Sequence, residues 1–299
     1  MCTFEQLAAE RLAEIDVLYP TAHKRQITAR LRRAWEKQPA VERIPYVVLH
    51  YRQDGFSPRD DLSAWENEFL AQLQGILHHR EWDDDYLPVF HFGIIQALIP
   101  ACFGCGERRS QDGRSVETVP VIHEAADVYK LASVGFGPDT LGGRMLEKMC
   151  FFQRAAQGRI LLAETDMQGP FSVASQIWGV EEFLLAIYEE PEAVHHLLEL
   201  TTDAIISYIQ RMFVVTEGNL SPLPLHAVSV DGQPIRRMCQ RGFARGGIPG
   251  GGQGIYCPIS RAHRPGIWRY ADAYLRQYEP QHPGARQYPV SDRGELLLE

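Results

Sequence analysis

The side chains with the clearest potential for chemistry follow short apolar runs of the sequence. Asp166 and Gln168 come just after residues 160–163, a run that indicates a buried strand. Because ligands collect at the carboxyl ends of parallel strands, we predict that these two residues are catalytic. The simpler interpretation of Asp166 is that its carboxylate caps the turn into a helix beginning near Pro170.

Three histidines occupy comparable positions. His50 ends the apolar run 44–50, His91 lies in the extended run 86–92, and His123 follows the run 119–122. Imidazole changes its charge near neutral pH and both donates and accepts hydrogen bonds, so we predict that these side chains contact substrate. A lone histidine at a strand end is also commonly a satisfied structural group, and that alternative stays open.

Other clusters of polar residues are predicted to be structural or solvated. Cys102 and Cys105 have the spacing of a redox or zinc pair, but no second pair lies at a matching distance along the chain. The three carboxylates at 83–85 form a run typical of a solvated loop. The histidine pairs at 78–79 and 195–196 fall on helical patterns and are expected at the surface. We therefore predict no metal site.

The elements that must position the site alternate along the chain. Short apolar strands indicate burial on both faces, and amphipathic stripes such as Trp65, Phe69 and Leu73 indicate helices. The polar stretch 107–118 is predicted to be a loop. This alternation favours an α/β fold with a parallel sheet, either a barrel or a doubly wound sheet. Helices are expected over residues 4–15, 23–37, 62–79, 94–102, 125–132, 141–157, 171–178, 180–188 and 190–215.

Length and charge exclude several classes of function. The 299 residues suffice for one large domain, and the formal net charge of -8 disfavours nucleic acid and anionic membranes as partners. No run of roughly 18 apolar residues is present, and the first residues lack the basic and apolar segments of a secretory signal. We predict a cytoplasmic protein that acts on a small-molecule substrate.

A series of short motifs over residues 166–194 identifies a family. The order is Asp-Met-Gln-Gly-Pro-Phe from Asp166, Trp-Gly at 178–179, and Tyr-Glu-Glu-Pro-Glu-Ala-Val from Tyr188. These motifs resemble the uroporphyrinogen decarboxylase (URO-D) superfamily, clearly over 120–219 and more faintly over 40–105. The resemblance implies a (β/α)8 TIM barrel of the uroporphyrinogen decarboxylase type, with its site at the carboxyl ends of the strands.

The two branches of this superfamily differ near the first two strands. The porphyrinogen decarboxylases are recognised by Arg-Gln-x-Gly-Arg after the first strand and by an aspartate after the second. Here Arg52 begins Arg-Gln-Asp-Gly-Phe, so Phe56 replaces the second arginine, and no aspartate occurs at 90–93. The resemblance therefore favours a corrinoid- or tetrapyrrole-related methyltransferase as the parent enzyme, with Arg52 binding substrate and a corrinoid protein as a further partner. Uroporphyrinogen decarboxylase, a carboxy-lyase, and a non-catalytic binding module are the alternatives.

The sequence changes character after Pro224. Residues 225–299 hold 11 Gly, 7 Pro, ten Arg and no Lys, with almost no helical periodicity. A native disordered tail has such a composition, but it is usually poor in Trp, Tyr and Cys, which this tail keeps. With one choice of synonymous codons, three of its segments read in a single shifted frame as motifs that the family places there.

These observations predict a frameshift near residues 221–225. Residues 1–224 are then the N-terminal part of a single barrel with a helical N-terminal extension, and 225–299 are a non-native tail. The resemblance implies zinc and a corrinoid for the intact family member. The His-Thr-Cys of its zinc site appears only in the shifted frame, so we predict that this chain binds no cofactor and is inactive.

Overall fold

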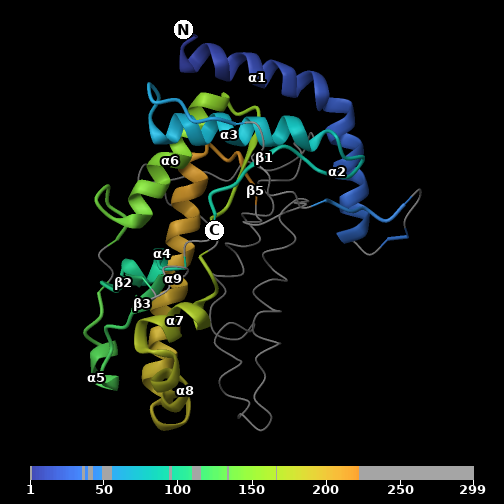
Figure 1. The fold of residues 1–299 in the computed structure, drawn as a ribbon. Helices are drawn as coiled ribbons and strands as arrows, with labels where there is room; N and C mark the ends of the chain where they lie inside the picture. Colours follow the sequence, from blue (N-terminus) through green and yellow to red (C-terminus); the bar gives the residue numbers. More distant parts are fainter. Residues whose placement is uncertain are drawn as a thin grey trace, which may run out of the picture.

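The chain forms alternating helices and short strands in a computed structural model (Figure 1). The structure describes residues 2–35, 38–39, 43–48, 56–93, 96–109, 116–132, 135–165 and 167–221. The tail and the proposed frameshift lie outside these residues. The helices are α1 (Phe4–Leu18), α2 (Thr21–Trp35), α3 (Ala64–His79), α4 (Leu98–Ala101), α5 (Ala125–Val128), α6 (Leu141–Ala156), α7 (Pro170–Trp178), α8 (Val180–Glu189) and α9 (Pro191–Val215). The strands are β1 (Val89–Phe90), β2 (Gly106–Arg109), β3 (Val116–Val119), β4 (Leu161–Ala163) and β5 (Leu220–Ser221).

A three-stranded parallel sheet positions the carboxyl ends of β1, β4 and β5. The strand order is β1-β4-β5, with Phe90 opposite Leu162 and Leu162 opposite Leu220. All three side chains are completely buried, as expected for strands covered on both faces. The prediction of an α/β fold with a parallel sheet is confirmed. The described part of the chain does not close into a barrel.

Asn219 fixes the register of β5 against its neighbour. Its side-chain amide donates to the Ile160 carbonyl at 2.8 Å and to Gln153 Oε1 at 2.9 Å. Its own carbonyl accepts from the Leu162 amide at 3.1 Å. One polar residue therefore ties the start of β5 both to β4 and to α6, and the C-terminal end of β5 comes to the same edge as that of β4.

The helices begin where the sequence supplies capping groups. Ser63 and Glu66 form a reciprocal capping box at the start of α3, and Thr3 and Gln6 form another at α1. Pro191 opens α9, where its fixed backbone angle suits the first turn of a helix, and the helix predicted over 190–215 is confirmed. Among the described helices, none is long and apolar enough to cross a membrane.

An aromatic cluster joins the N-terminal helices to the sheet. The rings of Phe69, Phe90 and Phe152 lie with centroids 5.0 to 5.2 Å apart and are completely buried. Phe69 and Leu73 confirm the predicted core stripe of α3. Figure 1 shows α9 beside α6, with α1 and α3 towards one end of the molecule and α7 and α8 towards the other.

The predicted loop at 107–118 is wrong at both of its ends, because β2 and β3 form an antiparallel pair there, and residues 110–115 lie outside the described residues. Arg108 stands opposite Glu117, and their side chains form an ion pair at 2.9 Å. Both side chains are largely exposed. An exposed pair of strands can be stabilised by such cross-strand pairs without apolar alternation, so the pattern used to recognise strands is missing.

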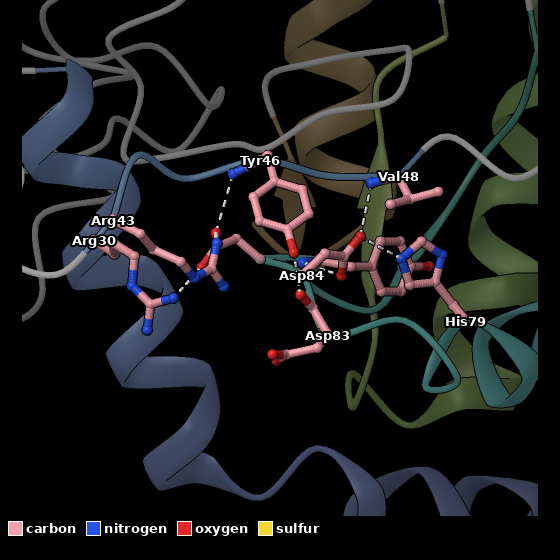
Figure 2. A network of polar contacts seen from close by, with 9 residues as sticks. Arg30, Arg43, Tyr46, Val48, His79, Asp83 and Asp84 are labelled. Carbon is pink, nitrogen blue, oxygen red and sulfur yellow. Dashed lines mark hydrogen bonds and ion pairs between the residues drawn. The ribbon is translucent and has the colours of Figure 1, made fainter.

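The predicted buried strand at 44–50 is also wrong within its described residues. Residues 43–48 belong to no strand, and Ile44 is 79% exposed. Two carboxylates take the place of a neighbouring strand. Asp85 accepts from the Tyr46 amide at 3.0 Å, and Asp84 accepts from the Val48 amide at 2.7 Å (Figure 2).

These carboxylates contradict the prediction of a solvated run at 83–85, since only Asp83 is exposed. Asp85 is completely buried and pairs with Arg30 at 2.7 Å and with Arg43. Asp84 is buried and contacts His79 Nε2 at 2.9 Å. We call these contacts the Asp84–Asp85 network (Figure 2).

The predicted surface position of His79 is likewise wrong. Its ring is buried and stacks on Tyr86, with the centroids 3.8 Å apart. Burial raises the pKa of Tyr86 above its ordinary value. Carboxylates are rarely buried unless they are paired, and the arginines that pair with Asp85 lie 42 and 55 residues away along the chain. Local charge alone therefore could not predict this burial.

Candidate functional site

The parallel sheet brings two loops together at its carboxyl edge. Thr165, two residues after β4, donates its hydroxyl to the carbonyl of Gly93, three residues after β1, at 3.3 Å. The Glu164 amide donates to the Ser221 carbonyl of β5 at 3.0 Å. Residues from all three strand ends thus meet at one edge, which is where ligands bind in parallel α/β folds.

Glu164 and Thr165 are site candidates that the sequence reasoning missed. Glu164 is only 5% exposed and Thr165 only 1%. An acidic residue directly after an apolar strand is the signal in the sequence that points to Glu164. A buried carboxylic acid at a strand end is a candidate to hold or transfer a proton.

His91 lies directly after β1, as expected from the apolar run before it. Its backbone amide donates to Gln72 Oε1 at 2.8 Å, and its carbonyl accepts from Gln72 Nε2 at 2.8 Å. The side chain of His91 is half-buried. One side-chain amide on α3 therefore fixes the backbone that carries this histidine, close to the Thr165–Gly93 contact.

Gln168 lies in the loop between β4 and α7 with a left-handed backbone conformation, φ 64°. This conformation costs a non-glycine residue about 1 kcal/mol, so its neighbours must hold it. Its Oε1 accepts from Gln176 Nε2 at 2.7 Å, and Gln176 Oε1 accepts from the Thr118 hydroxyl at 3.1 Å. A polar chain from β3 through α7 thus orients the Gln168 amide.

His123 is not part of the parallel sheet's edge. It lies exposed between β3 and α5, and its backbone amide donates to Asp127 Oδ2 at 3.1 Å. The preceding strand, β3, pairs with β2 rather than with β1, β4 or β5. The predicted site residues His50, Arg52 and Asp166 lie outside the described residues.

The described residues do not supply the donor set that zinc needs. Within them, no group of three or more His, Cys, Asp or Glu side chains could hold a metal ion. Cys102 and Cys105 are both buried, and burial raises the pKa of Cys105 to about 12. The Cys105 thiol therefore stays protonated near neutral pH, which agrees with the structural role predicted for the pair.

Residues 92–216 match the family model described as uroporphyrinogen decarboxylase (URO-D). This part of the chain is similar to the URO-D family. The URO-D segment spans α4 to α9 and includes β4 with the loop that carries Gln168. The resemblance predicted from the motifs at 166–194 is confirmed.

Among solved structures, a methyltransferase from Methanosarcina mazei is similar to the chain, with a TM-score of 0.43 and 17% sequence identity. The similarity covers 63% of this chain and 56% of the methyltransferase. No curated protein matches the sequence. The matched segment shows a similarity to the URO-D family over residues 92–216.

Proposed function

We propose that this chain derives from a URO-D-type methyltransferase that acts on a corrinoid or related tetrapyrrole. The observation that carries the proposal is the matched segment at 92–216, whose β4 loop meets the end of β1 through Thr165 and Gly93. The rest of a (β/α)8 barrel would place further strand ends beside this edge.

Two departures from the decarboxylase pattern favour methyl transfer. Phe56 replaces the second arginine of the decarboxylase motif, and His91-Phe92-Gly93 follows β1 without an aspartate. A porphyrinogen carries several carboxylates and pyrrole N–H groups, so an enzyme that acts on it needs cationic and carboxylate partners for them. Without one arginine and one aspartate of that motif, the chain lacks partners that a porphyrinogen needs and that methyl transfer does not require.

The proposed site assigns roles by side-chain chemistry. Asp166 and Gln168 are the catalytic candidates, as proton acceptor and hydrogen-bonding amide. His50, Arg52 and His91 are the substrate-binding candidates, and the predicted role of His123 is not carried into the site because His123 follows a strand of the other sheet. Zinc and a corrinoid belong to the intact parent enzyme in this proposal. No step is assigned to zinc in this chain, because the described residues offer it no donor set.

We further propose that the chain as written is inactive because its reading frame shifts near residues 221–225. The change in composition after Pro224 supports this view. A barrel that lacks its last strands would expose apolar sheet faces and unpaired edges, which favour aggregation. A small-molecule substrate and a corrinoid protein are the partners expected of the repaired enzyme.

The test compares the chain as written with a version whose frame is restored after residue 221, together with resequencing of codons 215–230. Each is assayed for methyl transfer from a methyl-corrinoid to a thiol, for bound zinc, and for uroporphyrinogen decarboxylation. Methyl transfer and bound zinc are expected only in the repaired chain. There, Asp166→Asn should lower turnover by about 100-fold, while Asp83→Asn serves as the matched control and should not.

The remaining outcomes separate the alternatives. Decarboxylation of uroporphyrinogen by the repaired chain would assign the other branch of the family. Turnover by the chain as written would contradict its inactivity. An intact reading frame in the resequenced gene would reject the frameshift. Absence of both reactions from the repaired, folded chain would favour a binding module.

A further inference from the structure

Helix α8 exposes a second apolar face besides the one that it buries. Phe183, Ala186 and Ile187 face the core, where all three are at most 5% exposed. On the remaining surface, the exposed fraction reaches 57% for Val180, 61% for Leu185 and 60% for Tyr188, and Leu184 is 40% exposed. A surface helix normally has one apolar stripe and a polar opposite face, so this second stripe needs an explanation.

The exposed stripe follows the helical repeat. Val180, Leu184 and Tyr188 are spaced four residues apart, and neighbouring turns of a helix place such residues one above another. Leu185 widens the stripe at its centre. Adjacent exposed apolar side chains of this kind mark interaction surfaces more often than single ones do. We call these four residues the α8 face.

The charged residues of α8 and of the first turn of α9 are all glutamates, and they form the rim of the α8 face. All of its five glutamates are exposed, and in the described part of the structure none of them forms an ion pair. The sequence holds no Lys or Arg at all between residues 160 and 210. The charges that the chain places on and next to α8 are therefore of one sign. The rim residues are Glu181, Glu182, Glu189, Glu190 and Glu192.

We propose that the α8 face binds a basic amphipathic helix of a partner protein. Leucine-like side chains of that helix would cover Leu185 and Tyr188, and its lysines or arginines would meet the glutamate rim. A second copy of the same face would place glutamates against glutamates. An anionic membrane would also be repelled, because interfacial helices that bind such surfaces are basic.

Charge and size together set the expected strength of binding. The ten residues of α8 span about 15 Å, so the contact is small and the complex is transient. Opposite charge steers the encounter, and exposed charges are screened by salt. The proposed complex should therefore weaken steeply as ionic strength rises. This inference does not depend on the proposed enzyme activity.

The probe is a labelled synthetic helical peptide built from leucine and lysine at helical spacing, titrated with the full chain and followed by fluorescence anisotropy. Leu185→Glu should weaken binding by about tenfold, because it places a charge in the stripe. Glu181→Lys with Glu189→Lys should weaken it similarly and reduce its salt dependence between about 50 and about 500 mM. Val214→Glu is the matched control, since Val214 is 73% exposed on α9, and should leave binding unchanged.

Several outcomes would overturn the proposal. One is the failure of the wild-type chain to bind the peptide, and another is equal weakening by Leu185→Glu and Val214→Glu. Equal binding of a matched leucine–glutamate peptide would remove the role of charge. Self-association that Leu185→Glu abolishes would assign the face to a second copy. Binding to vesicles containing phosphatidylserine, lost in the same variant, would assign it to a membrane.

Discussion

The chain segment at 43–48 and the strand β1 are held in place by opposite means. Buried charge holds the first, through the carboxylates of Asp84 and Asp85 and the guanidinium group of Arg30. Aromatic packing holds the second, through Phe90 and Phe152. Apolar packing tolerates any apolar side chain that fills the same space. A buried ion, in contrast, destabilises the fold when one of its partners is removed. The two regions should therefore respond differently to substitution.

The largest effect is expected in the aromatic core. Phe152→Ala removes a completely buried ring that contacts both Phe69 and Phe90. The resulting cavity should lower the free energy of unfolding by about 4 kcal/mol in urea titrations. Phe152→Leu keeps most of the volume and should cost less than about 1.5 kcal/mol. Equal losses in the two variants would show that cavity volume does not govern this region.

Removal of the buried charge of Asp85 should cause the second largest loss of stability. Asp85→Ala leaves Arg30, Arg43 and the Tyr46 amide without their shared acceptor. The two arginines remain partly exposed to water, so we expect a loss of about 3 kcal/mol rather than more. Asp83→Ala is the control, because Asp83 is exposed and should cost little. If the two variants unfold at the same urea concentration, the network does not anchor 43–48.

Loss of the neutral hydrogen bond between Thr118 and Gln176 should lower stability less than either of these substitutions. Thr118→Val removes the hydroxyl that donates to Gln176 and should cost about 1 kcal/mol. The side-chain amide signals of Gln176 and Gln168 should shift in NMR spectra, since the two amides are hydrogen-bonded to each other. Thr118→Ser keeps the hydroxyl and should preserve the wild-type shifts. Unchanged Gln168 signals in the valine variant would break the proposed link from β3 to the site.

An exposed ion pair should affect the titration more than the fold. The pKa of Asp127 lies below its ordinary value near 3.8, first because of the hydrogen bond from Lys130 and then because of the His123 and Glu124 amides. A lowered pKa means that the carboxylate stabilises the folded state above about pH 4, and that this contribution is lost as the pH falls through the folded pKa.

An NMR titration of the His123 and Glu124 amides tests this sign. The midpoint should lie below 3.8 in the wild type and move up towards 3.8 in Lys130→Met. A midpoint at or above 3.8 in the wild type would contradict it. Together with the Asp85→Ala result, this titration would distinguish a buried carboxylate that stabilises the fold from a surface carboxylate that changes only its own pKa.

The regular spacing of apolar residues made much of the secondary structure predictable. Features that depend on contacts between distant parts of the chain were not predictable. The stripe at Phe69 and Leu73, the run before Glu164 and the proline that opens α9 each act locally, and the structure confirms all three elements. The burial of Asp84 and Asp85 depends on groups 36 to 55 residues away along the chain, which no local pattern can reveal. The pair of β2 and β3 was also not predictable, because its exposed charged residues do not alternate with apolar ones.

The sequence predicted which residues follow strands, but not which of those strands lie side by side in one sheet. His91 does follow β1, but His123 follows a strand of the other sheet, because the sequence could not say which extended runs pair. Glu164 and Thr165 share the same loop as Asp166, and the sequence pattern does not set them apart from it. Burial distinguishes them, and burial follows from the way β4 lies between β1 and β5.

The Gln72 amide acts in place of a neighbouring strand at His91. It supplies one donor and one acceptor, the same two groups that a strand residue would offer. It thereby closes part of an edge that could otherwise recruit another chain. Only an amide can do this, since a carboxylate of the same shape has no donor. Gln72→Glu, which keeps every heavy-atom position, should therefore loosen the end of β1 and increase aggregation measured by light scattering.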